Sequence, residues 1–309
     1  MSLPSCKSRI FKPLRNIVIF TDDPGWHGRQ LVQAFARHDC HAVYVSLTDC
    51  QFSLEAEPFI RIPGFDQQLP DAAFVRGVPG GSLEEVVFYL DVLHGLKRLD
   101  VPVYNDAGAV ERSVDKAMTS LLLKHAGLST PMTWVLRDRE QALVIAEREL
   151  LMGHYLISKP LFGSQGEGIR RLEKSTDLMW LTSSRGIYYL QRFVECEGEG
   201  YADIRVFVIG GKVVAAMRRR GISWLNNVAR GASCEAIVVD DALAELAIRA
   251  VEILNMDYAG VDIIKDARGE YCVIEVNSVP AWKGLQSVCD IDVAECLVVH
   301  LCERYLEDV

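Results

Sequence analysis

The stretch YCVIEVNSVPAWKG at residues 271–284 joins an apolar strand pattern to two polar side chains near the end of that strand. Glu275 and Asn277 are two residues apart, so in an extended strand both side chains point to the same face. A buried carboxylate without a partner is costly, so Glu275 requires a lysine, a water-filled cleft or a metal ion beside it.

The preceding segment AGVDIIKD, at residues 259–266, predicts a second strand that forms a hairpin with this one. If the hairpin loop has an even number of residues, Asp262 lies opposite Val273 or Glu275, and the odd-numbered residues of the partner strand share one face. Asp262, Glu275 and Asn277 then converge. Each alone fits a solvated sheet face, but three on such apolar strands favour a Mg²⁺ site that also binds substrate phosphates.

A glycine-rich segment, ISKPLFGSQGEGIR at residues 157–170, has the character of a phosphate cradle. Gly163, Gly166 and Gly168 let backbone N–H groups approach anionic oxygens, and Lys159 leaves the preceding strand beside them. No Gly-Lys-Ser/Thr follows, so the segment is not a Walker A loop. Taken alone, it fits a flexible turn equally well.

Residues 211–231 carry a concentration of positive charge without one acidic residue. The basic side chains are Lys212, Arg218, Arg219, Arg220 and Arg230. They suit a clamp on a transferring phosphoryl group, with a solvated basic face or a nucleic-acid patch as the alternatives. The absence of interleaved aromatic residues argues against the patch. Trp224, Asn226 and Asn227 lie in the same run and are candidates for lining a substrate pocket.

The composition limits the class of protein. A chain of 309 residues exceeds the usual size of one core, so two or three subdomains are expected. The formal net charge of −9 argues against a general affinity for nucleic acid or an anionic membrane, and no apolar stretch is long enough to span a bilayer. Nine cysteines without metal-site spacing indicate reduced thiols, and a cytoplasmic protein is expected.

The order of predicted elements indicates an α/β protein. Residues 1–105 have a βαβ-like layout that includes a helix capped by Ser82, and no GxGxxG follows the first strand. A helix is expected over 113–124. Gly210 and Gly211 predict a hairpin turn between two strands at 203–218, and a helix is expected over 241–254.

Together these motifs resemble the ATP-grasp superfamily, and most closely its RimK-like amino-acid ligases, which include enzymes adding glutamate to proteins or cofactors. The resemblance rests on ERSVDKAMTSLLLKHAGLSTPMTW, ISKPLFGSQGEGI, DIRVFVIGGKVVAAMRRR, NNVARGA and AGVDIIKDARGEYCVIEVNSVP. It implies two α+β subdomains that clasp ATP, at residues 106–190 and 191–309, preceded by a pre-ATP-grasp α/β domain at residues 1–105.

The resemblance also implies roles for single residues. Lys116 and Lys159 are expected to contact ATP phosphates, and Asp262, Glu275 and Asn277 to hold Mg²⁺ or Mn²⁺. The nucleotide-binding set is completed by Gly163, Gly166, Gly168, Gln191, Arg192, Phe193, Val194 and Asp203. The catalytic set is Arg205, Arg219, Asn227 and Arg230. The hinge segment, residues 191–203, would contact adenine and ribose. The family usually has Glu after the Gln of this segment, where this chain has Arg192, and Leu225 stands where the ribosomal-protein ligase has an arginine.

The function implied is an ATP-dependent carboxylate–amine ligase. ATP phosphorylates a substrate carboxylate, and an amino acid, glutamate being favoured, attacks the acyl phosphate to form an amide. Its partners would be small-molecule carboxylates and amino acids, and the family resemblance suggests a homo-oligomer. Two alternatives stay open: a ligase for another amine such as D-alanine or a peptide, and a regulatory module that binds ATP without turnover.

Overall fold

A computed structural model of the chain describes residues 14–163, 166–198, 200–221, 223–225 and 231–306. The chain forms two compact units, residues 1–104 with 301–309 and residues 105–300. The predicted division of 106–309 into two subdomains stays a prediction, because both sheets of this region belong to one unit and the last residues group with the other. No helix in the described residues is long and apolar enough to cross a membrane.

The first unit is built on a parallel sheet with the strand order β2-β1-β5-β6, as its βαβ pattern predicts. Its elements are β1 (Arg15–Phe20), α1 (Gly25–Arg37), β2 (Cys40–Val45), η1 (Leu47–Asp49), β3 (Gln51–Phe52), β4 (Ile60–Arg61), β5 (Ala72–Val75), α2 (Leu83–Arg98) and β6 (Val103–Tyr104). The four apolar residues at the end of β1 are fully buried. Ser82 caps α2 in a capping box with Glu85, which confirms the predicted start of this helix.

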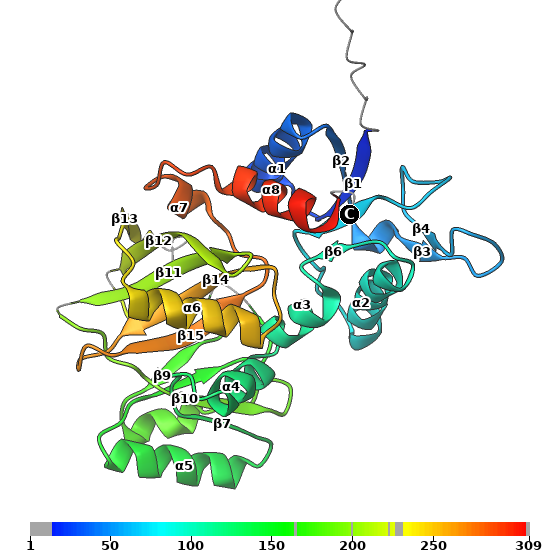
Figure 1. The fold of residues 1–309 in the computed structure, drawn as a ribbon. Helices are drawn as coiled ribbons and strands as arrows, with labels where there is room; N and C mark the ends of the chain where they lie inside the picture. Colours follow the sequence, from blue (N-terminus) through cyan, green and yellow to red (C-terminus); the bar gives the residue numbers. More distant parts are fainter. Residues whose placement is uncertain (1–13, 164–165, 199, 222, 226–230, 307–309) are drawn as a thin grey trace, which may run out of the picture. The chain divides into compact units, whose positions relative to one another are not determined.

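The second unit contains a small antiparallel sheet with the order β7-β10-β8-β9 (Figure 1). The elements of this part are α3 (Ala107–Val114), α4 (Lys116–His125), β7 (Thr133–Leu136), α5 (Arg139–Leu151), β8 (Leu156–Lys159), β9 (Arg170–Leu172), η2 (Ser175–Trp180) and β10 (Tyr188–Arg192). Helix α5 packs its alanine face, Ala142 and Ala146, on leucines of the sheet. This sheet presents Lys159 and Gln191 from neighbouring strands, β8 and β10.

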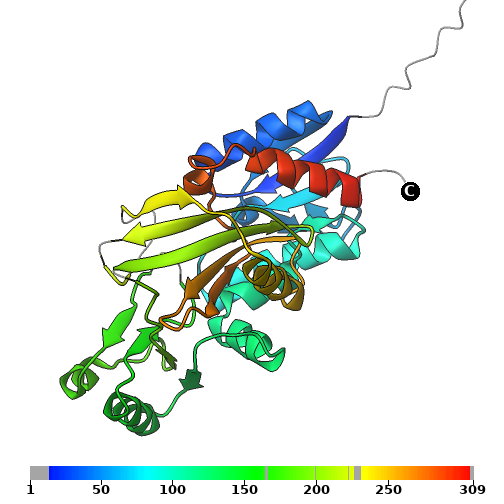
Figure 2. The same ribbon diagram turned by 60° about the vertical axis from the view of Figure 1, so that its left-hand side comes forward.

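A five-stranded antiparallel sheet with the order β13-β12-β11-β14-β15 completes this unit (Figure 2). The elements that follow along the chain are β11 (Tyr201–Ile209), β12 (Lys212–Gly221), β13 (Ser233–Ala236), α6 (Asp241–Ile253), β14 (Tyr258–Lys265), β15 (Tyr271–Asn277), α7 (Lys283–Gln286) and α8 (Val293–Tyr305). The last turn of α8, from Leu301 onward, groups with the first unit. Helix α6 covers one face, where valines and isoleucines of the strands form the core. The turn predicted at Gly210 and Gly211 joins β11 to β12, with φ values of 56° and 73°.

The helix predicted over 113–124 is interrupted. Asp115 ends α3 and caps α4, because its side chain accepts hydrogen bonds from the backbone N–H groups of Ala117 and Met118. Lys116 therefore becomes the first residue of α4 rather than a mid-helix residue.

Candidate active site

The hairpin β14–β15 brings the three predicted oxygen donors to neighbouring positions. Asp262 pairs with Glu275, and Gly260 pairs with Asn277. The expected position of Asp262 opposite Glu275 is therefore observed. Two carboxylates and an amide oxygen are hard donors of the kind that Mg²⁺ accepts, so the donor set fits that ion.

The strand register of this hairpin contains an irregularity that the sequence analysis did not predict. Lys265 pairs with Tyr271, which leaves an odd number of residues in the loop, and Ile274 is then an extra residue that forms a bulge. The bulge also corrects the expectation that odd-numbered residues of β15 share one face. Val273 lies in the hydrophobic core, whereas Ile274 and Glu275 both line a pocket.

This pocket encloses about 570 Å³ of empty space, including its open mouth. Its described lining residues are Ser113, Lys116, Thr119, Ser120, Lys159, Pro160, Phe162, Gly163, Gly166, Glu167, Ile169, Tyr189, Ile274 and Glu275. The pocket thus combines both predicted lysines, two of the three predicted glycines and one predicted metal ligand.

Lys159, at the end of β8, carries its ammonium group into this pocket. Its Nζ donates to Oε1 of the buried Gln191 at 2.7 Å, and the Gln191 amide nitrogen donates to Thr133 Oγ1 at 3.1 Å and to Tyr189 Oη at 3.2 Å. Gln191 is thereby locked in one orientation. Burial lowers the pKa of Lys159 to about 8, against a partial opposing effect of Glu275.

Lys116 reaches the same pocket from the start of α4. Its Nζ donates to the carbonyl oxygens of Gly163 at 2.8 Å and Leu161 at 3.4 Å. Burial lowers its pKa, while the nearby carboxylates of Glu275 and Asp115 act in the opposite direction. Lys116 therefore ties α4 to the beginning of the glycine-rich segment.

The three predicted glycines all adopt backbone angles that other residues avoid. Gly163, Gly166 and Gly168 have φ values of 134°, 75° and 70°. A Cβ on Gly166 would lie 2.9 Å from Cδ1 of Leu225, so the glycine-rich segment and the loop after β12 meet at this point. Residues 164–165 lie outside the described residues.

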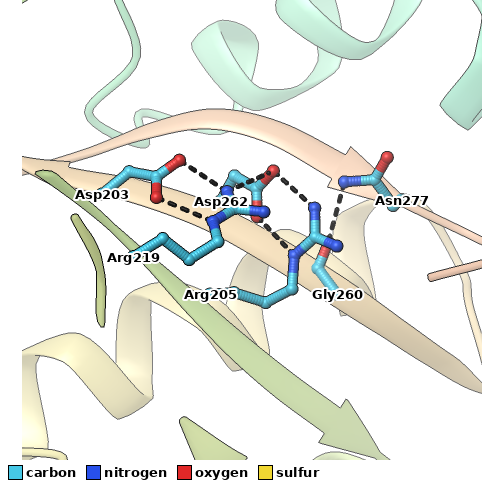
Figure 3. A network of polar contacts seen from close by, with 6 residues as sticks. All are labelled: Asp203, Arg205, Arg219, Gly260, Asp262 and Asn277. Carbon is cyan, nitrogen blue, oxygen red and sulfur yellow. Dashed lines mark hydrogen bonds and ion pairs between the residues drawn. The ribbon is translucent and has the colours of Figure 1, made fainter. Parts of the chain in front are cut away.

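Four charged side chains form a second group on the five-stranded sheet (Figure 3). We call Asp203, Arg205, Arg219 and Asp262 the charge quartet. Arg205 donates through Nε and a terminal nitrogen to the two oxygens of Asp262, both at 2.7 Å. Arg219 donates in the same way to Asp203, at 2.7 and 2.5 Å, and also lies 3.1 Å from an Asp262 oxygen.

The quartet is largely shielded from solvent and is balanced in charge, with two cations and two anions. The side chain of Arg219 is 5% exposed and that of Asp262 is 9% exposed. Burial alone would raise the pKa of Asp262, but the two guanidinium groups outweigh it and hold that pKa at about 2. The predicted metal ligand Asp262 is thus ionised and fully engaged by arginines in this structure.

The quartet places Asp203 differently from its expected role as a nucleotide contact. Both oxygens of Asp203 accept hydrogen bonds from Arg219, a residue predicted to be catalytic. The turn at Gly210 and Gly211 alone would place Asp203 opposite Arg218. A register shift between Phe207 and Val208 moves it opposite Arg219, so the sequence pattern does not reveal this pairing.

Arg192 of the hinge segment also points to an unpredicted partner. Its Nε donates at 2.6 Å to Oε2 of Glu149, whose side chain is only 1% exposed. Arg148 binds the other oxygen of Glu149 at 2.9 Å. Glu149 falls three and seven residues after Ala146 and Ala142 on the buried face of α5, a spacing that could have identified it.

The remaining hinge residues form an aromatic cluster. Phe193 packs edge-on to Trp224, with ring centroids 6.4 Å apart, and the Arg171 guanidinium lies 4.0 Å from the Phe193 centroid. The Phe193 N–H donates to the Tyr155 carbonyl at 2.9 Å, and Val194 is half-buried. The packing of Trp224 on the hinge links the loop after β12 to the predicted adenine segment.

Two predicted catalytic residues, Asn227 and Arg230, lie outside the described residues. Within the described ranges, no three His, Cys, Asp or Glu side chains are grouped so that they could hold a metal ion. A site at Asp262 and Glu275 therefore depends on the Asn277 amide and on oxygens from a bound substrate.

Comparison with known proteins identifies the family. The model of the RimK-like ATP-grasp domain matches residues 113–301. The chain belongs to the RimK-like ATP-grasp family. The predicted family, fold and enzyme class, an ATP-dependent ligase, are thereby confirmed.

Relatives of this RimK-like chain cover most of its length. The tetrahydromethanopterin:alpha-L-glutamate ligase of Methanococcus maripaludis is 30% identical over 288 residues, which cover 91% of this chain and 95% of the relative. A probable alpha-L-glutamate ligase of Xanthomonas axonopodis pv. citri is 35% identical over 246 residues, covering 78% of this chain and 79% of the relative.

Solved structures show the same fold. The ATP-grasp ligase PsnB in complex with a minimal precursor superposes with a TM-score of 0.71 at 22% identity, covering 94% of this chain and 98% of PsnB. A RimK domain ATP-grasp protein from Sphaerobacter thermophilus gives a TM-score of 0.69 at 21% identity, covering 94% of this chain and all of that one. At this identity the likeness concerns the fold.

Proposed function

We propose that this RimK-like chain joins L-glutamate, through its amino group, to the carboxylate of a second substrate in a reaction driven by Mg·ATP. The observation that carries the proposal is the pocket that holds Lys116, Lys159 and Glu275 together, with Asp262 paired to Glu275 on the adjacent strand. Two cations and two hard anions at one site suit a polyphosphate with its divalent cation.

Different residues of the site would bind the phosphates and the cation. Lys116 and Lys159 would hold phosphate oxygens of ATP, with the backbone of the glycine-rich segment around them. Asp262, Glu275 and Asn277 would hold Mg²⁺, which when bound screens the charge of the phosphate oxygens. Arg205 and Arg219 are adjacent to Asp262 and would neutralise the phosphoryl group during transfer.

The proposed reaction has two steps. A carboxylate oxygen of the acceptor attacks the γ-phosphorus, the bond to the β-phosphate oxygen breaks, and ADP leaves. The glutamate nitrogen attacks the acyl carbon, inorganic phosphate leaves, and the nitrogen loses a proton to give the amide. The protein contributes positioning and charge neutralisation, because phosphorylation has already activated the acyl group.

The acceptor is proposed by class. The Methanococcus relative is named for glutamate and tetrahydromethanopterin, and its coverage of both chains favours a small-molecule carboxylate. PsnB was solved with the precursor peptide PsnA2, but its low identity supports only the fold. We also propose that the protein is soluble and cytoplasmic, does not bind nucleic acid and assembles as a homo-oligomer.

The test is ADP release by the purified chain with Mg·ATP, supplied with glutamate alone, a carboxylate panel alone, and both together. We expect release only when both substrates are present, and hydroxylamine should trap an acyl hydroxamate when glutamate is omitted. Release with D-alanine or a peptide amine in place of glutamate would favour the second ligase alternative. Tight ATP binding without turnover under every combination would favour a regulatory module.

A further inference from the structure

The two arginines of the charge quartet have different main carboxylate partners, because Asp203 binds only one of them. In the described part of the chain, both hydrogen bonds of the Arg205 side chain go to Asp262. Arg219 instead donates two hydrogen bonds to Asp203 and also lies 3.1 Å from an oxygen of Asp262. Arg205 is therefore held by the predicted metal ligand, and Arg219 is held by a different carboxylate.

A cation that binds Asp262 competes with these arginines for the same two oxygens. Each carboxylate oxygen has limited capacity, and a divalent cation beside a guanidinium group meets like-charge repulsion. Arg205, which depends on Asp262, must move or weaken its contacts. Arg219 keeps its two hydrogen bonds to Asp203 and can stay where it is.

We propose that Asp203 is a positioning residue that anchors Arg219 and so keeps Asp262 available for the divalent cation. This inference rests on the proposed function, because it takes Asp262 as a ligand of Mg²⁺. Without Asp203, the Arg219 guanidinium can transfer its hydrogen bonds to Asp262, which already lies 3.1 Å away. Asp262 would then accept hydrogen bonds from both guanidinium groups, and the cation would have to displace both.

The position of the pair on the sheet supports an anchoring role. Asp203 and Arg219 are opposite each other on β11 and β12, so their backbones are fixed by the ladder that the Gly210–Gly211 turn closes. The side chain of Asp203 is 16% exposed and that of Arg219 is 5% exposed, so this contact is shielded from solvent. A shielded, two-bond Arg–carboxylate pair resists exchange better than an exposed one.

The test measures binding of a non-hydrolysable ATP analogue by calorimetry as free Mg²⁺ is varied. Asp203→Asn should raise the Mg²⁺ concentration for half-maximal nucleotide binding by about fivefold, the scale of coupling between directly contacting groups. Arg205→Met should lower that concentration, because it removes the two hydrogen bonds to Asp262 that the cation must displace. These are binding measurements, so loss of turnover does not confuse them.

A double variant distinguishes anchoring from a simple loss of negative charge. If Asp203 acts through Arg219, adding Asp203→Asn to Arg219→Met should leave the Mg²⁺ requirement of Arg219→Met unchanged. If Asp203 merely attracts the cation through space, the requirement should rise equally in both backgrounds, and the inference is overturned. An unchanged requirement in the single Asp203→Asn variant overturns it as well.

Folding is checked by thermal melting of each variant. Should Asp203→Asn not fold, Arg205→Met and Arg219→Met still decide the question, because release of Asp262 must lower the Mg²⁺ requirement more for Arg205→Met. An equal or reversed order counts against the inference. Absence of Mg²⁺-dependent nucleotide binding in the wild-type chain would instead overturn the proposed function itself.

Discussion

Lys159 Nζ donates a hydrogen bond to Gln191 Oε1 at 2.7 Å, between adjacent strands of the small sheet. The acceptor is a neutral amide, so this contact orients the ammonium group without neutralising it. Burial lowers the pKa of Lys159 to about 8, from an ordinary value of 10.5. The geometry therefore prepares a cation whose charge favours the arrival of an anion.

This relationship predicts proton uptake when ATP binds. Near pH 8 about half of the free chains carry a neutral Lys159, and a polyphosphate beside it favours the charged form. Nucleotide affinity should fall as pH rises from 8 to 10. Calorimetry at pH 8.5 in buffers of different ionisation enthalpy should show uptake of about half a proton or more per nucleotide. Lys159→Met should remove most of this uptake, whereas Lys212→Met, at an exposed position, should retain it.

The same group affects stability in a defined direction. Its folded pKa is lowered, so between about pH 8 and 10.5 the unfolded chain binds more protons at Lys159 than the folded chain does. The contribution of Lys159 therefore makes the folded state less stable below pH 8 and disappears as pH rises through this window. Urea unfolding of the wild-type chain and of Lys159→Met at pH 7.5 and 10 should show the difference between the two proteins shrinking with pH.

Glu275→Gln should abolish ligation with little effect on folding. The substitution keeps the side-chain volume but removes one of the two carboxylates proposed for Mg²⁺, so we expect kcat to fall by at least about 100-fold. Glu270→Gln, at an exposed position on the same hairpin, should retain normal activity. Steady-state kinetics at limiting Mg²⁺ are the measurement, and near-normal turnover would refute the metal assignment. Asp262→Asn is less informative, because it also leaves two buried arginines without their shared carboxylate.

Asn105 should be a major determinant of stability in the second unit. Its buried amide donates to the carbonyls of Tyr258 and Ser278 at 2.7 and 2.8 Å, and its oxygen accepts from the backbone of Asp257 at 2.7 Å. Asn105→Ala removes these hydrogen bonds from a buried site, so the free energy of unfolding should fall by about 3 kcal/mol. Asn255→Gly is the control, because Asn255 is exposed with a φ of 53° and should tolerate glycine. Equal urea midpoints for the two variants would contradict this account.

The Glu149–Arg192 pair should act as a structural clamp on the hinge strand. Glu149→Gln removes a buried charge that two arginines share, and we expect a loss of about 2–3 kcal/mol, less than for a fully buried pair because Arg192 is one-third exposed. Arg192→Met should cost less. The double variant should be more stable than the sum of the two single losses implies, as a double-mutant cycle in urea would measure. Additive losses would show that the pair has no coupling.

Much of the candidate site is predictable because it depends on short-range spacing. The chain pattern Asp262…Glu275-x-Asn277 predicted a shared position on one hairpin, and the structure pairs Asp262 with Glu275. The reason offered for that pairing was wrong in detail, because Ile274 forms a bulge that compensates an odd loop. A bulge depends on how a strand packs against its neighbours, so alternation of residues cannot reveal it.

The sequence by itself determined the family, the order of elements and the chemical character of the pocket, since these follow from local patterns of glycines, lysines and hard oxygen donors. Tertiary structure alone decided which partner each charged side chain takes. Asp203 forms an ion pair with Arg219, Asp262 with Arg205, and Glu149 with Arg192. An arginine in a sequence has many carboxylates within reach, and only strand register, burial and side-chain direction select among them, because in a low-dielectric interior each charge requires its own partner at hydrogen-bond distance.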